Sequence, residues 1–475
     1  MKKREFKLHP AILLFLLTIV IMIISSVGSI LNLETTYYNV NPVTGELETQ
    51  IVMINNLFNR TGLQYLISNM LNNFTSFAPL GNLILGLMGV GIAYKSGFLN
   101  TLFKMIVKNK PKKLFTFLVV LSGVISSMFF EAGYVILLPL AAILFMNLDR
   151  HPSIGVAAAF AGISFGYGAN IVINGVDNVL INYTQNATKI LDPNYMVSPT
   201  GNLIFMIFST IAIAYLGMII TEKYVVPKLG KYSLEDEDID LHAEVTKKEK
   251  KGVGVSILFS SILILIIAYC IIPGLPFSAL LLNLKEKTYI AQLFGDGSYF
   301  KQGSVLIFSF IIGFAGLVYG IRVKTIRNNR DLMNCMSYYL QGFASLLVLI
   351  FFAAQFVLIF KETNIGVFIV VSLTELLENL QLNGIVLIIL TFIIVTISTI
   401  FVPNLSTKWA IMSPVLVPMF MQSSFTPEFS QAVFRAADSA TKGVTPLFTY
   451  FVILLGILQI YNSKKRDVIT LTDGV

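Results

Sequence analysis

Five ionisable residues stand inside long apolar stretches of this sequence: Glu131, Asp177, Lys408, Arg435 and Asp438. A charge at bilayer depth costs roughly 2.5 to 3.5 kcal/mol on insertion scales, so such residues indicate function by default. Arg435 offers a planar fork for a carboxylate or sulfonate, and Asp438 is suited to orient that fork or to exchange a proton. Because the two residues are three apart on one predicted helix, a purely structural ion pair between them is the alternative.

The composition explains why these charges matter. The chain has 475 residues, of which 55% are hydrophobic and 13% are charged, and its mean hydropathy is +0.76. Soluble domains contain about 25% charged residues. The apolar stretches supply the roughly 20 helical residues that cross a hydrocarbon core of about 30 Å, whereas a barrel would show alternating segments of about 10 residues. The sequence therefore predicts an all-α polytopic membrane protein.

Other kinds of site are not indicated by the sequence. The two cysteines and three histidines follow no metal-ligand spacing, so we expect no metal site, no disulfide and no cofactor. No zinc-protease motif or comparable set of nucleophile and base stands at membrane depth, and we expect no enzyme. The net charge of +8 comes largely from short basic loops, which orient a membrane protein and do not indicate a nucleic-acid partner.

The basic loops also predict the topology. Apolar spans are expected at 11–31, 77–94, 154–185, 201–224, 253–272, 304–321, 332–360 and 428–461. Lys and Arg are enriched in cytoplasmic loops, which places the N-terminus and residues 95–113, 223–251 and 322–330 in the cytoplasm. The less basic segments 32–76, 186–200 and 273–303 then lie outside. This pattern is expected of a multi-pass membrane protein with a cytoplasmic N-terminus.

The chain divides into two related halves. A charged cytoplasmic linker at 233–252 separates a first half, 1–232, from a second half, 253–475. Residues 116–168 align without gaps to 391–443 at an offset of 275, with 13 identities in 53 positions, including Pro139/Pro414 and Pro152/Pro427. The predicted topology inverts one copy relative to the other. Inverted repeats with interrupted helices are typical of secondary transporters, whose sites lie near the bilayer midplane.

Two regions of the repeat are interpreted as re-entrant hairpins. Residues 114–146 form the cytoplasmic-side hairpin, with Glu131 at its irregular tip, and 385–421 form the outer-side hairpin, with Lys408 and Trp409 near its tip. Irregular backbone at this depth is tolerated where protein shields it or a water-filled cavity contacts it. Trp409 is then suited to stack on a ligand ring, or to anchor at the interface if the hairpin spans fully, and Lys408 is expected to reach water.

Two helix interruptions are predicted beside these hairpins. Glycine or proline and small polar residues interrupt the apolar spans at 165–178 and 438–446, and a simple kink is the alternative. Such breaks free backbone groups that bind an ion or an anionic substrate. Asn170, Asn174 and Asn178 are spaced by four, so we expect them to share one helix face, which would be polar in the membrane.

At these residues the sequence resembles the p-aminobenzoyl-glutamate transporter (AbgT) family. The resemblance is carried by EAGYVILLPLAAILF, RHPSIGVAAAFAGISFGYGAN, STKWAIMSPVLVPMFM and FTPEFSQAVFRAADSATKGVTPL. It implies a homodimeric, elevator-like carrier with a scaffold and a mobile core that contains two hairpins. The family's important positions fall here on Asp177, Ser406, Trp409, Pro427, Arg435, Asp438 and Pro446.

The sequence also departs from the family pattern. Pro403, Asn404 and Leu405 replace a glycine- and serine-rich tip, Thr399 replaces an asparagine, and Glu131 stands for an aspartate. The family continues with one more transmembrane helix, and the 275-residue offset places that helix at 476–499. We therefore expect the second half to lack its closing helix.

Residues and resemblance together predict a function. We expect a secondary transporter, coupled to H⁺ or Na⁺, that moves small aromatic anions such as p-aminobenzoyl-glutamate or exports sulfonamide-type antimetabolites. The alternatives are a channel and a non-transporting truncated membrane protein. The expected partners are the substrate, membrane lipid and a second copy of the chain.

Overall fold

The computed structural model describes residues 8–40, 47–129, 131–230, 244–295, 297–342 and 344–461. It is mostly helical, as predicted. In chain order the helices are α1 (Pro10–Ile30), α2 (Arg60–Thr75), α3 (Ala78–Lys95), α4 (Phe98–Val107), α5 (Lys112–Ser126), η1 (Ser127–Phe129), η2 (Gly133–Leu137), α6 (Leu138–Asn147), α7 (Pro152–Phe165), α8 (Gly175–Thr188), α9 (Leu203–Ile220), η3 (Thr221–Val225), α10 (Val226–Leu229), α11 (Lys247–Tyr269), α12 (Tyr289–Phe294), α13 (Tyr299–Val323), α14 (Asn329–Ser337), α15 (Ala344–Glu362), α16 (Ile365–Asn379), α17 (Gly384–Phe401), α18 (Leu405–Gln422), α19 (Pro427–Thr441) and α20 (Phe451–Ile460).

Eight helical stretches of the described residues are long and apolar enough to cross a membrane. They are Pro10–Ile30, Arg60–Lys95, Lys112–Phe129, Leu203–Leu229, Lys247–Tyr269, Tyr299–Val323, Ala344–Glu362 and Gly384–Phe401. Most predicted spans coincide with one of these helices. The span predicted at 332–360 corresponds to Ala344–Glu362, but its predicted start is wrong, because residues 332–337 belong to the separate helix α14. The predicted linker 233–252 lies outside the described residues up to 243, and its residues 247–252 belong to α11.

The all-α expectation is wrong in the segment that follows α1. Strands β1 (Glu34–Val40) and β2 (Leu47–Met53) pair antiparallel, with Glu34 opposite Met53. The hairpin is attached to the α15–α16 junction, where the Asn364 amide donates to the Met53 carbonyl oxygen at 3.1 Å. The Thr35 hydroxyl also donates to the Glu375 carboxylate at 2.7 Å. Tertiary contacts therefore hold a short hairpin that its local sequence did not reveal.

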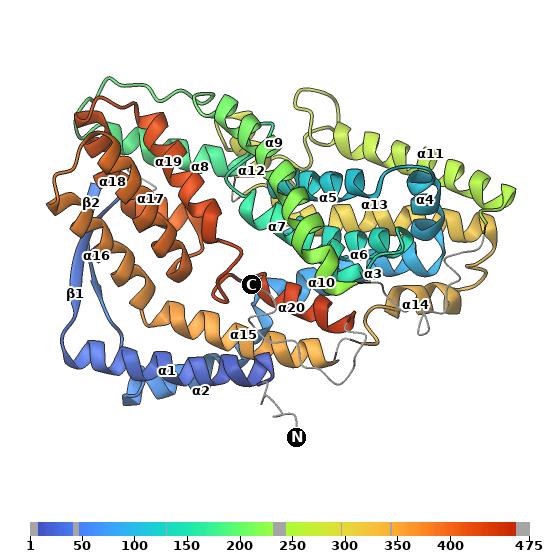
Figure 1. The fold of residues 1–475 in the computed structure, drawn as a ribbon, viewed down its shortest axis with the longest axis horizontal. Helices are drawn as coiled ribbons and strands as arrows, with labels where there is room; N and C mark the ends of the chain where they lie inside the picture. The colour runs from blue at the N-terminus through green and yellow to red at the C-terminus, as the bar shows by residue number, and fades with distance from the viewer. Residues whose placement is uncertain are drawn as a thin grey trace.

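The buried apolar side chains form two main clusters, which correspond to two groups of helices in Figure 1. The larger cluster lies among α3, α5, α6, α7, α13, α15 and α20. The smaller one lies among α8, α16, α17, α18 and α19, on the side of the molecule that carries β1 and β2. Each cluster takes elements from both halves of the sequence, since α8 packs with α18 and α19, and α20 packs with α6 and α7.

The two predicted helix interruptions are confirmed, and they have equivalent bounds. Helix α7 ends at Phe165 and α8 begins at Gly175, while α19 ends at Thr441 and α20 begins at Phe451. Adding 275 to the α7 and α8 bounds gives 427–440 and 450–463, close to α19 and to the start of α20. Both α7 and α19 begin with a proline, where the missing N–H is not needed.

Contacts around the two interruptions are reciprocal. The Asn170 amide donates to the Ile125 carbonyl oxygen at 3.4 Å, and the Thr445 hydroxyl donates to the Ile400 carbonyl oxygen at 2.7 Å. The two donors, like the two acceptors, are 275 residues apart. A Cβ on Gly168 would lie 3.0 Å from the Ser439 hydroxyl oxygen. A Cβ on Gly443 would lie equally close to the Ser164 side chain. Gly168 and Gly443 are 275 residues apart, and so are Ser164 and Ser439.

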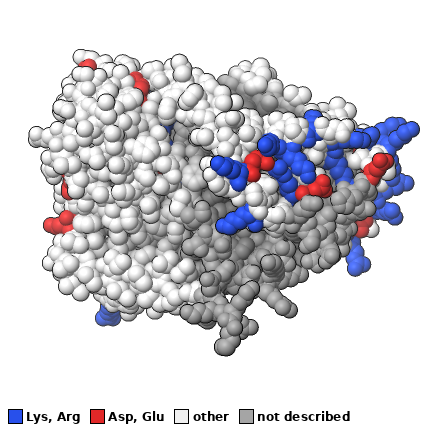
Figure 2. Space-filling model, in the orientation of Figure 1, with Lys and Arg blue, Asp and Glu red and all other residues white. Residues whose placement is uncertain are grey.

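Basic side chains gather at one end of the molecule (Figure 2). This is the end at which Figure 1 shows α4, α11 and α14. Lys108, Lys110, Lys324 and Arg330 are among its exposed residues. They come from the loops 95–113 and 322–330, which the charge pattern had assigned to the same side of the membrane.

Candidate functional site

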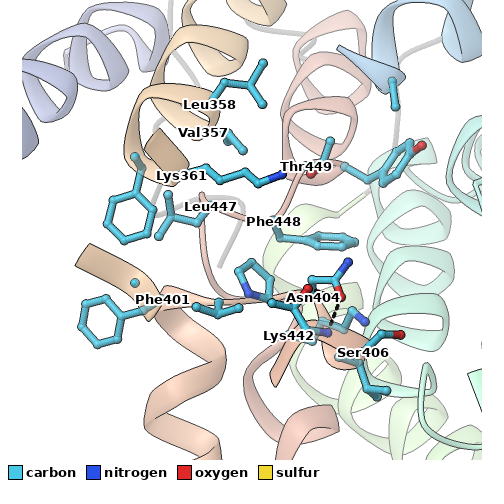
Figure 3. Close-up of a pocket in the computed structure, with 18 of the residues that line it drawn as sticks. Val357, Leu358, Lys361, Phe401, Asn404, Ser406, Lys442, Leu447, Phe448 and Thr449 are labelled. Carbon is cyan, nitrogen blue, oxygen red and sulfur yellow. Dashed lines mark hydrogen bonds between the residues drawn. The ribbon is translucent and has the colours of Figure 1, made fainter. Parts of the chain in front are cut away.

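A cavity of about 440 Å³ lies where the two predicted hairpin tips meet. One side is formed by Glu131, in the turn between η1 and η2. The other is formed by residues 401–407, which comprise the end of α17, the connection after it and the start of α18. The α15–α16 junction and the segment after α19 complete it. Its lining includes Glu131, Tyr134, Tyr167, Lys361, Asn364, Phe401, Asn404, Ser406, Lys442, Phe448, Thr449 and Tyr450 (Figure 3). This volume lies in the range of small-molecule sites.

The cavity wall combines aromatic rings with charged side chains. Tyr134 and Tyr450 stack with their ring centroids 5.0 Å apart and their planes at 11°, and Phe448 packs edge-on against Tyr134 at 5.3 Å. Seen in Figure 3, the Phe448 ring lies between Lys361 and the group formed by Asn404, Lys442 and Ser406. An aromatic surface beside cations is suited to a ligand that has both a ring and an anionic group.

Asp438 lies behind the cavity wall and faces two lysines. Its Oδ1 atom forms an ion pair with the Lys408 ammonium group and lies 3.4 Å from the Thr399 hydroxyl, to which Lys408 also donates. Its Oδ2 atom accepts no hydrogen bond among the described residues and lies 4.0 Å from Nζ of Lys442. Asp438 and Lys408 are completely buried. The expectation that Lys408 reaches water is therefore wrong for this structure.

Arg435 belongs to a different ion pair. Its guanidinium donates to the Asp177 carboxylate, and its Nη1 also donates to the Gly168 carbonyl oxygen at 3.2 Å. The suggested structural pair between Arg435 and Asp438 is therefore wrong, since each residue has a partner elsewhere. Arg435 contacts a second, mainly apolar cavity of about 410 Å³ between α7, α9 and α19, and it does not line the first one.

Asp177 is placed by local chain geometry. The Asn174 side chain caps the start of α8, and Asp177 accepts a hydrogen bond from the Asn174 N–H at 2.7 Å, which completes a capping box. Asn170 lies before the helix, in the interruption, where its amide also donates to the Ser127 hydroxyl at 3.2 Å. The prediction that Asn170 and Asn174 share one helix face is therefore wrong.

Trp409 is buried in the protein, so the interpretation as an interfacial anchor is wrong. Its Nε1–H donates to the Thr184 hydroxyl at 2.9 Å and lies 3.2 Å from the Leu180 carbonyl oxygen, both on α8. Its ring packs against Phe434 at 4.5 Å. Trp409 does not line the central cavity, and in this structure it joins α18 to α8.

Of the remaining predicted residues, some line the cavity and others lie elsewhere in the fold. Ser406 and Glu131 line the cavity, whereas Pro427 is buried at the start of α19 and Pro446 lies in the interruption before α20. Lys442 was missed although it stands within the predicted interruption, four residues after Asp438. Its charge within an apolar span was the sequence signal that could have identified it. No sequence signal marks Lys361 or the cavity tyrosines, because only the fold brings these residues together.

The arrangement defines a class of protein: a polytopic helical membrane protein with a cavity lined by residues from distant parts of the chain. The sequence profile of the AbgT putative transporter family matches residues 6–473, so the chain belongs to that family. The resemblance noted in the sequence is confirmed, and the chain is a multi-pass membrane transporter.

Individual relatives are similar over nearly their whole length. The p-aminobenzoyl-glutamate transport protein of Escherichia coli is 30% identical over 459 residues, which cover 96% of this chain and 86% of that protein. MtrF of Neisseria gonorrhoeae, described as illuminating a class of antimetabolite efflux pumps, is 35% identical, with 99% and 92% coverage and a TM-score of 0.50. The YdaH transporter of Alcanivorax borkumensis is 31% identical, with 98% and 93% coverage and a TM-score of 0.48.

Proposed function

We propose that this protein is an ion-coupled secondary transporter of small aromatic anions, with p-aminobenzoyl-glutamate as the leading substrate. The observation that carries the proposal is the central cavity, because both hairpin tips contribute to it and its wall holds rings beside cations. The relation to the Escherichia coli p-aminobenzoyl-glutamate transport protein supports this choice. A glutamate-bearing aryl amide has the ring and the carboxylates that such a wall accommodates.

The transport mechanism belongs to the same proposal. The equivalent bounds of the two helix interruptions and the reciprocal glycine contacts support an inverted repeat with two re-entrant hairpins. In such carriers the site lies where the repeats meet, and the lining of this cavity by Glu131 and by residues 401–407 supports that position. We further propose an elevator-like movement of a core that contains both hairpins, in a homodimer surrounded by lipid. Coupling to H⁺ or Na⁺ would use buried carboxylates, of which Asp438 is the leading candidate.

Orientation and location follow from the charge pattern. The gathering of basic loops at one end supports a cytoplasmic position for that end, in the bacterial inner membrane, with a cytoplasmic N-terminus.

Export of sulfonamide-type antimetabolites is the second candidate. The specific support is the similarity to MtrF, which is described with a class of antimetabolite efflux pumps. A sulfonamide also has an aromatic ring and a polar sulfonyl group, so the same cavity wall is suited to it.

Flux measurements in proteoliposomes test both candidates. We expect saturable flux of p-aminobenzoyl-glutamate or of a sulfonamide when an H⁺ or Na⁺ gradient is imposed, and loss of that flux in Asp438→Ala. Liposomes with Lys189→Gln, which changes an exposed lysine, are the matched control. Absence of saturable flux of both compounds under every gradient would refute the proposal.

A further inference from the structure

Lys442 is the cation that connects the buried charges with the central cavity. It lies in the segment directly after α19, is only 3% exposed, and lines the cavity. Its Nζ lies 4.0 Å from Asp438 Oδ2 on one side and 3.0 Å from the ring centroid of Tyr167 on another. The Phe448 ring centroid is 5.9 Å away. The ammonium group is thus held by a distant carboxylate and by aromatic faces.

The charges around this group do not balance. Asp438 has one negative charge, and Lys408 already pairs with it. Glu131 and Lys361 also line the cavity, so the cavity and the cluster behind it contain three lysines and two carboxylates. The pair of Arg435 and Asp177 is separate and neutral in sum. A buried cation without a full partner is unfavourable, so this site favours an additional anion.

We propose that Lys442 binds the acidic group of an aromatic anion and thereby selects anions over neutral aromatic compounds. The ammonium faces the cavity beside Tyr167 and Phe448, so one ligand can place its carboxylate or sulfonate on Lys442 and its ring against these side chains. Arg435 is not the receiving fork, because it is paired with Asp177 and lies outside this cavity. This proposal specifies the substrate class of the proposed transporter. It rests on the proposed function only in taking the cavity as the transport site.

The test is a comparison of two ligands of equal shape. Binding of 4-aminobenzoate and of neutral 4-aminobenzamide is measured by calorimetry on the full chain in lipid nanodiscs. Loss of a charged hydrogen bond weakens binding about tenfold to a hundredfold. We therefore expect Lys442→Gln to weaken 4-aminobenzoate binding by that factor while 4-aminobenzamide changes less than about threefold. We expect Lys442→Arg to retain the preference for 4-aminobenzoate over 4-aminobenzamide. We expect Lys189→Gln to leave the affinity for both ligands unchanged.

Other outcomes overturn the inference. Equal weakening of both ligands in Lys442→Gln would show a structural role for the lysine, and unchanged binding of 4-aminobenzoate would show that the anion lies elsewhere. Failure of the parent protein to bind 4-aminobenzoate would also contradict it. The two proposals fail separately: anion-selective binding that depends on Lys442, without flux in proteoliposomes, refutes transport and leaves the anion site in place.

Discussion

Replacing Asp177 by asparagine tests whether the Arg435 guanidinium forms a structural ion pair with Asp177 or is an unpaired group available to a ligand. Asparagine keeps an oxygen that accepts the Asn174 N–H, so the start of α8 stays capped and only the charge is removed. The side chains of Arg435 and Asp177 are 2% and 3% exposed, and Nε of Arg435 has no hydrogen-bond partner in the described part of the chain. Removing one member of a buried pair costs about 3 to 5 kcal/mol.

The assay is equilibrium unfolding in mixed detergent micelles, with Asp192→Asn as the control. Asp192 lies on an exposed loop, where removal of a charge changes the free energy of unfolding by less than about 0.5 kcal/mol. The double variant Asp177→Asn with Arg435→Met removes both charges, and we expect it to recover about half of the loss. An Asp177→Asn variant that is destabilised no more than Asp192→Asn would refute the pairing of Arg435 with Asp177.

Three further predictions concern packing, the tryptophan and pH. Gly162→Ala places a Cβ 2.3 Å from a carbonyl oxygen of α5 and should destabilise the protein by about 1 to 3 kcal/mol in the same unfolding assay, whereas Gly254→Ala, with nothing within 4 Å, should not. Trp409 is the only tryptophan, so the intrinsic emission should be blue-shifted and inaccessible to iodide, and an iodide-quenched emission would contradict its burial. Burial lowers the pKa of His151 from 6.5, which means that the fold favours its neutral form. Its contribution to stability is therefore complete above pH 6.5 and is lost as the pH falls below it, and melting curves of His151→Asn should depend less on acid pH than those of the parent.

The sequence predicted well those features that depend on local pattern. Long apolar stretches located most of the spans, and the interruption near Asn170 followed from glycine and polar residues in an apolar setting. The offset of 275 relates the bounds of α7 to those of α19 from the sequence alone. The charges at membrane depth were predicted to be functional, which stays a prediction, whereas the expectation that Lys408 reaches water is wrong.

The partners themselves could not be predicted. Arg435 and Asp177 are 258 residues apart, and Lys408 and Asp438 are 30 apart, so neither pair follows from helix spacing. Local spacing suggested Arg435 with Asp438, and tertiary packing overrode it. The cavity has the same origin, because Glu131, Lys361 and Lys442 come from three separate parts of the chain.

The separation of Arg435 from Asp177 has a consequence for biosynthesis. Ribosomes add about 5 to 20 residues per second, so Asp177 enters the membrane about 10 to 50 s before Arg435 has been made. A carboxylate without a partner is costly to bury in an apolar medium. The nascent first half must therefore keep water or other polar groups beside Asp177 until α19 is inserted. The completed ion pair thus marks a chain whose last third has reached its place.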